Sequence, residues 1–381
     1  MKTKPTIISS LLLWLLINAI FILKYVPRAG VSEWLMLGVW LLCSGLCLSI
    51  AIWFQRRIKD RNFLWPTAGL TLFMLAGIVA AILLVDPLSV RVDRWSATSY
   101  FIDALFRGEY PYGVHTHVSE THFPSPLPFW HYLNIPFRLM GDVGWQLVFF
   151  LLLTLASFRW FTGSWSKTFM FALVLALSPA YWWEVAVRSD GLNNMLLVFC
   201  FLLLMEKQKI DFGNRWWLLA LLCGLIASTR LSALIPVAVY LFRPYVKAEW
   251  WKMVAFPLIV IAVVFLMFAP YIFWDTESWI FFSRNPFMSQ TETGSIWVLV
   301  GFMLFGVAAA FAWRSFSQYM NLTGWFIFLF MRVSIIVAWR MACSDIAWRD
   351  CAACDISYLT LAMPFAAYGI SELLKTDERV V

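Results

Sequence analysis

An aspartate follows the third long apolar run of the chain, where apolar residues give way to polar ones. The run covers residues 64–86, and Asp93 stands seven residues beyond it. A carboxylate beside a membrane-embedded segment raises the free energy unless it is paired or used in function. Asp93 is therefore a candidate functional residue, because a carboxylate can take the proton of a reacting hydroxyl group and accelerate the reaction about 10²–10⁴-fold. The structural alternative is a solvated aspartate paired with Arg91 or Arg94.

Charged residues gather at a second junction between apolar runs. Glu184, Arg188 and Asp190 lie within seven residues there. An arginine side chain carries a planar fork of N–H donors that suits a phosphate group, and carboxylates accept hydrogen bonds from sugar hydroxyl groups. We therefore expect Arg188 to bind a donor phosphate and Glu184 or Asp190 to lie near an acceptor sugar. The structural alternative is that Ser189 or Asp190 caps the following helix and that Arg188 pairs locally.

Two further arginines are candidates for binding the same phosphate. Arg230 stands alone in an apolar region, where its charge is costly unless it faces a polar cavity. Arg349 lies in the polar segment 340–355 and either lines the donor site or pairs locally with Asp345 or Asp350. The same segment holds three cysteines, Cys343, Cys351 and Cys354. A disulfide among them is expected if this side of the membrane is oxidising.

All four histidines of the chain fall within seventeen residues, at positions His115, His117, His122 and His131. We expect His115, His117 and the nearby Tyr112 to hydrogen-bond a sugar or phosphate, and we expect no cofactor. The alternative is a divalent metal on His115, His117 and His122, because imidazole and carboxylate groups bind zinc or manganese.

The composition places the chain in a lipid bilayer. Hydrophobic residues make up 62% of the 381 residues and charged residues only 13%, whereas a soluble domain carries about 25% charged residues. The net charge of +7 comes from Lys and Arg scattered in short clusters between apolar runs. Such clusters are typical of topology signals, so we expect no nucleic-acid partner.

The apolar runs predict an all-α polytopic membrane protein with about 11–12 transmembrane helices in a single domain, residues 1–381. A spanning helix needs about 20 mostly apolar residues. The expected spans are 7–26, 34–54, 64–86, 143–162, 167–183, 189–206, 215–230, 231–243, 250–273, 295–313, 321–340 and 355–374. Whether residues 215–243 form two helices or one kinked helix stays open at this point.

One long connection, residues 87–142, separates the third and fourth spans. Apolar residues recur at helical spacing between Trp95 and Phe106, which predicts an amphipathic helix on the membrane surface. Gly108 ends this helix and Pro111 blocks its continuation. Seventeen of the 29 Lys and Arg fall on the side of the N-terminus, so the positive-inside rule predicts a cytoplasmic N-terminus and an outer long loop.

The segments "GEYPYG" and "PSPLPFWHYLNIPFRLMG", which follow the Asp93 region and its surface helix, resemble the first outer loop of GT-C superfamily glycosyltransferases. Within that superfamily the chain resembles the mannosyltransferases that depend on polyprenyl-phosphate mannose. The later segments "SPAYWWEVAVRSDGLNNMLLVF", "GLIASTRLSALIPVAVYLFRPY" and "DISYLTLAMPF" are similar to its second outer loop, middle spans and last span. The resemblance covers residues 64–374, implies that Asp93 is the general base, and makes residues 1–63 two additional N-terminal spans.

The function that we expect is transfer of a sugar, mannose or another hexose, from a polyprenyl-phosphate donor to a glycan or glycolipid acceptor. The active site would lie on the outer face of a membrane that we expect to be the bacterial inner membrane. The alternative hypothesis is a transporter or flippase of lipid-linked sugars, a class with similar composition.

Overall fold

The computed structural model describes residues 4–274, 286, 295–351 and 354–374, and all regular secondary structure in these ranges is helical. Within these described ranges, six helical segments are long and apolar enough to cross a membrane. They contain α1 (Lys4–Tyr25), α2 (Glu33–Gln55), α3 (Leu64–Leu84), α6 (Gln146–Thr162), α12 (Trp250–Trp274) and α16 (Phe316–Ala342). The predicted all-α polytopic membrane protein is confirmed.

The remaining predicted spans also coincide with helices, but these are shorter or bent. They are α9 (Asp190–Gln208), α10 (Trp216–Ala227), α11 (Leu234–Tyr245), α15 (Ile296–Ala312) and the pair η7–α17 (Ile356–Ala362 and Met363–Ser371). Residues 215–243 thus form two helices, which the non-helical residues 228–230 and the short turn η6 (Leu231–Ala233) separate.

One predicted span is broken. The helices α7 (Trp165–Ala176) and α8 (Pro179–Ala186) meet at an angle of 69°. The break falls at Ser178, because the residue before a proline is disfavoured in helical conformation. The Ser178 hydroxyl accepts a hydrogen bond from the Tyr181 backbone N–H and so caps the second helix.

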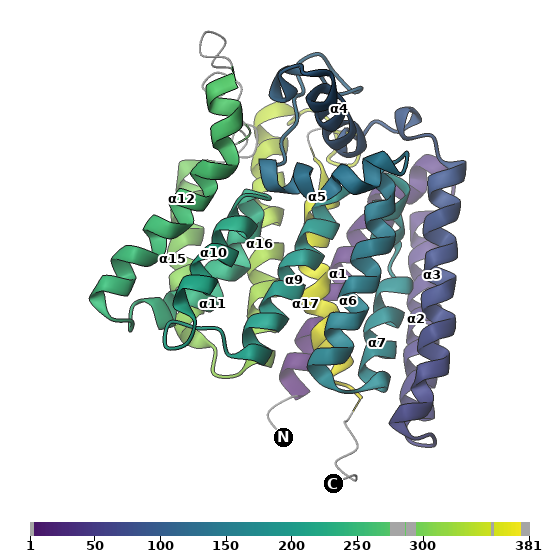
Figure 1. Ribbon diagram of the computed structural model, residues 1–381. Coiled ribbons are helices and arrows are strands. Elements are labelled where there is room, and N and C mark those ends of the chain that lie inside the picture. Colours follow the sequence, from purple (N-terminus) through teal and green to yellow (C-terminus); the bar gives the residue numbers. More distant parts are fainter. Residues whose placement is uncertain (1–3, 275–285, 287–294, 352–353, 375–381) are drawn as a thin grey trace.

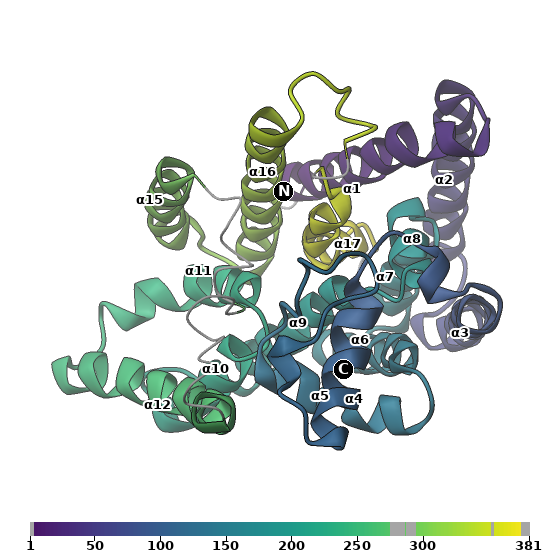
Figure 2. The same ribbon diagram turned by 90° about the horizontal axis from the view of Figure 1, so that it is seen from above.

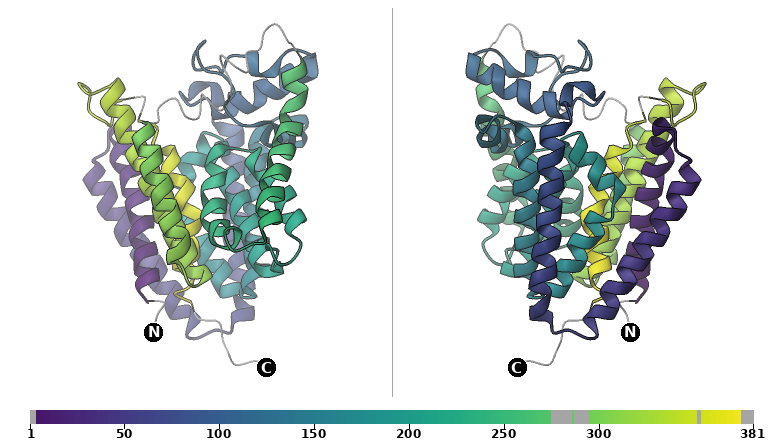
Figure 3. Two further views of the ribbon diagram at one scale, coloured as in Figure 1. Left: turned by 90° about the vertical axis from the view of Figure 1, so that its left-hand side faces the viewer. Right: turned by 90° about the vertical axis from the view of Figure 1, so that its right-hand side faces the viewer.

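The start of α1 and the end of α17 lie at the same end of the helix bundle (Figure 1). Two surface helices, α4 (Arg94–Arg107) and α5 (Pro128–Leu139), lie at the opposite end (Figures 1 and 3). Viewed from above, α4 and α5 lie near α6 and α9 (Figure 2). We call the end of the bundle that carries these two helices the α4 face.

The predicted surface helix is confirmed in α4. Gly108 ends it in the left-handed conformation with φ of 73°, which glycine adopts without the steric penalty of a side chain. Phe101 is completely buried, so the apolar stripe of α4 faces the protein. Asp103 accepts two hydrogen bonds from the Arg138 guanidinium, at 2.7 and 2.9 Å. This bidentate pair fixes α5 against α4.

The two N-terminal helices differ in their surroundings. Trp14 of α1 is completely buried in the central core, where its ring N–H donates to the Val174 carbonyl oxygen at 3.2 Å. In contrast, α2 exposes large apolar side chains such as Trp34 and Leu42, as a lipid-facing helix does. Figure 2 shows α2 at the edge of the bundle, and α1 next to α16.

The contact between α10 and α12 leads to the first prediction. A Cβ atom at Gly224 would lie 2.6 Å from Val263 Cβ, so Gly224→Ala must push these helices apart. We expect a loss of about 1–3 kcal/mol in stability and a lower unfolding temperature of the detergent-solubilised protein. Gly301→Ala in α15 is the matched control, because nothing lies within 4 Å of its Cβ position. Equal unfolding temperatures for the two variants would contradict this packing.

Candidate functional site

A cluster of charged side chains lies beneath α4. Arg94, the first residue of α4, is 6% exposed. Its guanidinium donates to Asp355 Oδ2 at 2.8 Å, and its Nη1 lies 3.8 Å from Asp190 Oδ1. The guanidinium also stacks over the Tyr358 ring, 4.8 Å from its centroid. A single arginine therefore connects α4 with the start of α9 and with η7.

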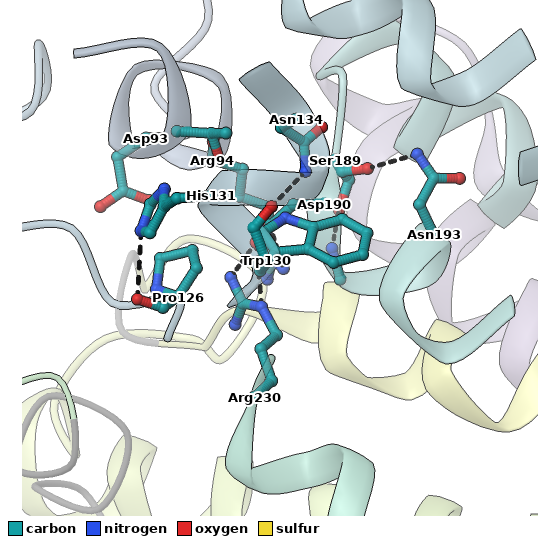
Figure 4. Close-up of polar contacts among 12 residues, drawn as sticks. Asp93, Arg94, Pro126, Trp130, His131, Asn134, Ser189, Asp190, Asn193 and Arg230 are labelled. Atoms are coloured by element: carbon teal, nitrogen blue, oxygen red, sulfur yellow. Dashed lines mark hydrogen bonds and ion pairs between the residues drawn. The ribbon is translucent and has the colours of Figure 1, made fainter. Parts of the chain in front are cut away.

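A second arginine reaches the same cluster from the α10–α11 turn. Arg230 Nε donates to Asp190 Oδ2 at 2.9 Å, and Nη2 bonds to the same oxygen. Both side chains are buried, Asp190 completely. Figure 4 shows Arg230 reaching Asp190 from the turn, while Arg94 approaches from α4. The sequence hypothesis that placed Arg230 and Asp190 in one polar site thus has a geometric basis.

Backbone hydrogen bonds hold this turn in place. The N–H groups of Leu127 and Phe129, at the start of α5, donate to the carbonyl oxygens of Thr229 and Ser228 at 2.9 and 3.0 Å. Arg230 itself is extended, with φ of −156° and ψ of 150°. The surface helices and the α10–α11 turn are therefore joined at the residues next to Arg230.

Asp93 lies at the edge of the cluster. It occupies the N-cap position of α4 but makes no side-chain capping bond, which leaves its carboxylate free for other partners. Oxygen Oδ2 lies 3.6 Å from His122 Nδ1, and 37% of the side chain is exposed. Desolvation by the surrounding protein raises the pKa of Asp93, although Arg94 and His122 oppose the shift. A raised pKa makes a carboxylate a stronger base.

Asp355 is the other partly exposed carboxylate of the cluster, with 38% of its side chain accessible. It caps η7 by accepting the Ser357 N–H at 2.9 Å. Desolvation alone would raise the pKa of Asp355, but the ion pair and hydrogen bond with Arg94 lower it below the ordinary value. Of the two edge carboxylates, Asp93 is thus the one suited to accept a proton.

Glu184 lies deeper and is completely buried on α8. Its carboxyl group is within electrostatic range of Arg94 and Asp355. The structure thus brings together Asp93, Glu184, Asp190 and Arg230 of the predicted site residues.

Two predicted phosphate-binding arginines lie outside this cluster. Arg188 is buried and pairs with Asp142, and its Nη2 also donates to the carbonyl oxygens of Ile82 and Val85 at 2.7 Å each. Its backbone is left-handed, with φ of 50°, a strained conformation that these bonds stabilise. Arg188 therefore fixes the end of α3 against the start of α9. Its neighbour Ser189 caps α9, as the structural alternative predicted.

Arg349 also has a structural partner. Its guanidinium donates to Glu33 at 2.9 Å, at the start of α2, and 43% of the side chain is exposed. The local pairing expected with Asp345 or Asp350 is replaced by this long-range pair.

Tyr112 and His131 belong to an aromatic core under α4. Tyr112 is 1% exposed and donates to the Pro126 carbonyl oxygen at 3.2 Å. The His131 ring stacks on Phe101 at a centroid distance of 3.6 Å. Desolvation lowers the pKa of His131 to about 3, so this ring is neutral at physiological pH. These two side chains position α4 and α5, and His131 is within electrostatic range of Arg230.

The other three histidines have separate contacts. His115 packs against Phe123, His117 contacts the Ser96 hydroxyl at 2.6 Å, and His122 approaches Asp93. Within the described part of the chain, no three His, Cys, Asp or Glu side chains form a group that could hold a metal ion.

Three members of the cluster were missing from the sequence prediction: Arg94, Asp355 and Tyr358. Arg94 was considered only as a partner for Asp93. Asp355 had a visible signal, because it is the first residue of the last expected span, 355–374, where an aspartate can cap a helix and lie at the membrane boundary.

Comparisons with protein-family models, with curated proteins and with solved structures found no match to this chain.

The Asp190–Arg230 pair leads to the second prediction. Arg230→Ala leaves Asp190 buried with only the longer contact to Arg94, and we expect a loss of about 3–5 kcal/mol in stability. The double variant Asp190→Asn with Arg230→Gln should lose less, because it removes both charges. Arg349→Ala is the control, since an exposed pair contributes about 0–1 kcal/mol. Thermal unfolding in detergent measures all three, and similar losses for Arg230→Ala and Arg349→Ala would contradict the role of the buried pair.

Proposed function

We propose that this protein is a glycosyltransferase that moves a sugar, mannose or another hexose, from a polyprenyl-phosphate donor to a glycan or glycolipid acceptor. The observation that supports it best is the position of Asp93. Its carboxylate makes no capping hydrogen bond and is partly exposed. It lies at the edge of a cluster that contains two buried arginines, Arg94 and Arg230. Together they supply a base and a positive charge, the two elements that this reaction requires.

The chemistry follows from these two elements. Asp93 takes the proton of the acceptor hydroxyl group, whose oxygen forms a bond to the anomeric carbon of the donor sugar. The bond between that carbon and the phosphate oxygen breaks, and its electron pair leaves with the lipid phosphate. Guanidinium groups stabilise the charge that develops on the phosphate, and they do so most strongly where water is excluded. In this proposal Arg94 and Arg230 take the phosphate-binding role that the sequence suggested for Arg188 and Arg349.

Two observations support an active site on the outer side of the membrane, which we propose to be a bacterial inner membrane. The bias of Lys and Arg favours a cytoplasmic N-terminus, and the α4 face lies at the other end of the bundle (Figure 3). The loop after α16 contains a disulfide between Cys343 and Cys351. Disulfides persist in oxidising compartments, and this loop leads directly to Asp355.

The placement of charges favours an enzyme over the alternative, a transporter or flippase of lipid-linked sugars. Transporters carry ionisable groups near the middle of the membrane, at the breaks of discontinuous helices. Arg94, Asp190 and Asp355 instead stand at the first residues of α4 and α9 and just before η7, on the α4 face.

The third prediction tests the proposed base. Asp93→Asn should reduce transfer by at least about 10²-fold without changing the unfolding temperature by much, because the side chain caps no helix. The assay uses purified protein with a panel of polyprenyl-phosphate sugars and follows lipid-phosphate release. Glu120→Gln, an exposed acidic residue of the same loop, is the matched control. Full activity of Asp93→Asn would refute the catalytic role, and donor movement across vesicles without phosphate release would support the transporter.

The fourth prediction tests the orientation. Thr121 lies in the loop of the α4 face, and Lys59 lies between α2 and α3 at the opposite end of the bundle (Figure 1). Both positions are exposed, and each is replaced by cysteine in a separate variant. In intact cells whose protein lacks the exposed Cys43, a membrane-impermeant maleimide should label Thr121→Cys only. Labelling of Lys59→Cys alone would reverse the proposed topology.

A further inference from the structure

Glu184 is a buried acid whose carboxyl oxygens make no hydrogen bond of normal geometry within the part of the chain that the structure describes. The side chain has an exposed fraction of 0%. Both oxygens are also shielded from a water-sized probe, so the solvent does not replace the missing partners.

Neighbours from four elements surround this carboxyl group. The Ser189 and Ser357 hydroxyls lie beside it. The titratable and charged groups in range are Arg94 from α4, Asp355 before η7 and Tyr25 from α1. Arg94 is the only cation among them, and it already bonds to Asp355 and pairs with Asp190.

The charge state of Glu184 follows from this arrangement. An ionised carboxylate without water and without a hydrogen bond of normal geometry carries a desolvation penalty of several kcal/mol. One arginine that already faces two carboxylates cannot offset a third. The neutral acid avoids the penalty, because its O–H can donate to a serine hydroxyl while the remaining charges of the cluster stay paired.

We propose that Glu184 holds a proton in the resting protein and that this proton limits the negative charge around Arg94 and Arg230, so that the two arginines can bind a phosphate. With Glu184 neutral, the two guanidiniums contact two carboxylates, Asp190 and Asp355, and Asp93 lies at the edge of the cluster. Ionised Glu184 would add a further negative charge and repel an anionic ligand. Glu184 therefore acts through the electrostatic environment of the two arginines and does not touch the phosphate. Its effect on phosphate binding rests on the proposed function.

Infrared spectroscopy of the protein tests directly whether the Glu184 carboxyl group is protonated. At neutral pH the wild type should show the carbonyl stretching band of a protonated carboxylic acid, and Glu184→Gln should lack it. Asp103→Asn should retain the band, because Asp103 accepts two hydrogen bonds from the Arg138 guanidinium and lies outside the Glu184 environment. A wild-type spectrum without the band would overturn the inference, and so would a band that persists in Glu184→Gln.

Ligand binding tests whether ionisation of Glu184 weakens the binding of a phosphate. The probe is a short-chain prenyl phosphodiester, which keeps one negative charge across the pH range. Its affinity for the wild type should fall by up to about tenfold per pH unit once Glu184 ionises, as the linkage of one proton requires. Glu184→Gln should keep the low-pH affinity at every pH, and Asp93→Asn should still show the decline.

The outcomes separate the two proposals. If the affinity of Glu184→Gln for the phosphodiester falls with pH as it does in the wild type, another group causes the pH dependence. That result would overturn the role of Glu184. A protein that binds no phosphodiester at any pH would overturn the phosphate role together with the proposed function, while the infrared band would still decide the protonation. If Glu184→Gln fails to fold, wild-type affinity that does not change with pH is sufficient to overturn the phosphate role.

Discussion

The buried contact of Asp190 with Arg230 and Arg94 is the constraint on which the α4 face depends. Asp190 is the first residue of α9, Arg230 lies between α10 and α11, and Arg94 begins α4. Since a buried charge without its partner is strongly destabilising, these elements cannot move apart independently. The hydrogen bond from Arg94 to Asp355 extends the same constraint to η7. Four segments that are distant in sequence are thus fixed around one carboxylate.

The membrane fold was predictable because a bilayer imposes a length and a composition on each crossing segment. Each predicted span coincides with a helix or a pair of helices. The open question was residues 215–243, where apolar residues continue through the turn. Hydropathy does not show whether residues 215–243 form one helix or two, because the break between α10 and α11 depends on tertiary contacts. Arg230 requires Asp190 as its partner, and the backbone of residues 228–229 bonds to the start of α5.

The site was predictable only in part, for a related reason. The cost of an ionisable group near lipid is visible in a sequence, and it marked Asp93 and Arg230 as residues that need an explanation. The partner of each group is not visible. Arg188 and Arg349 were expected at the same phosphate but pair with Asp142 and Glu33, far away in sequence. Arg94 was overlooked because it looked like a local partner of Asp93, whereas its contacts are with Asp190 and Asp355.

An arginine that is already paired is compatible with binding a phosphate. A carboxylate that holds a guanidinium in a fixed orientation reduces the reorganisation needed when a phosphate approaches. A phosphate and a carboxylate offer a similar arrangement of oxygen acceptors to the guanidinium fork. The same guanidinium can therefore bind a carboxylate and a phosphate together. The exchange is favourable only if the cluster does not become too negative. The protonation state of Glu184, which lies beneath Arg94 and makes no hydrogen bond of normal geometry within the described residues, is therefore a property on which phosphate binding at this face would depend.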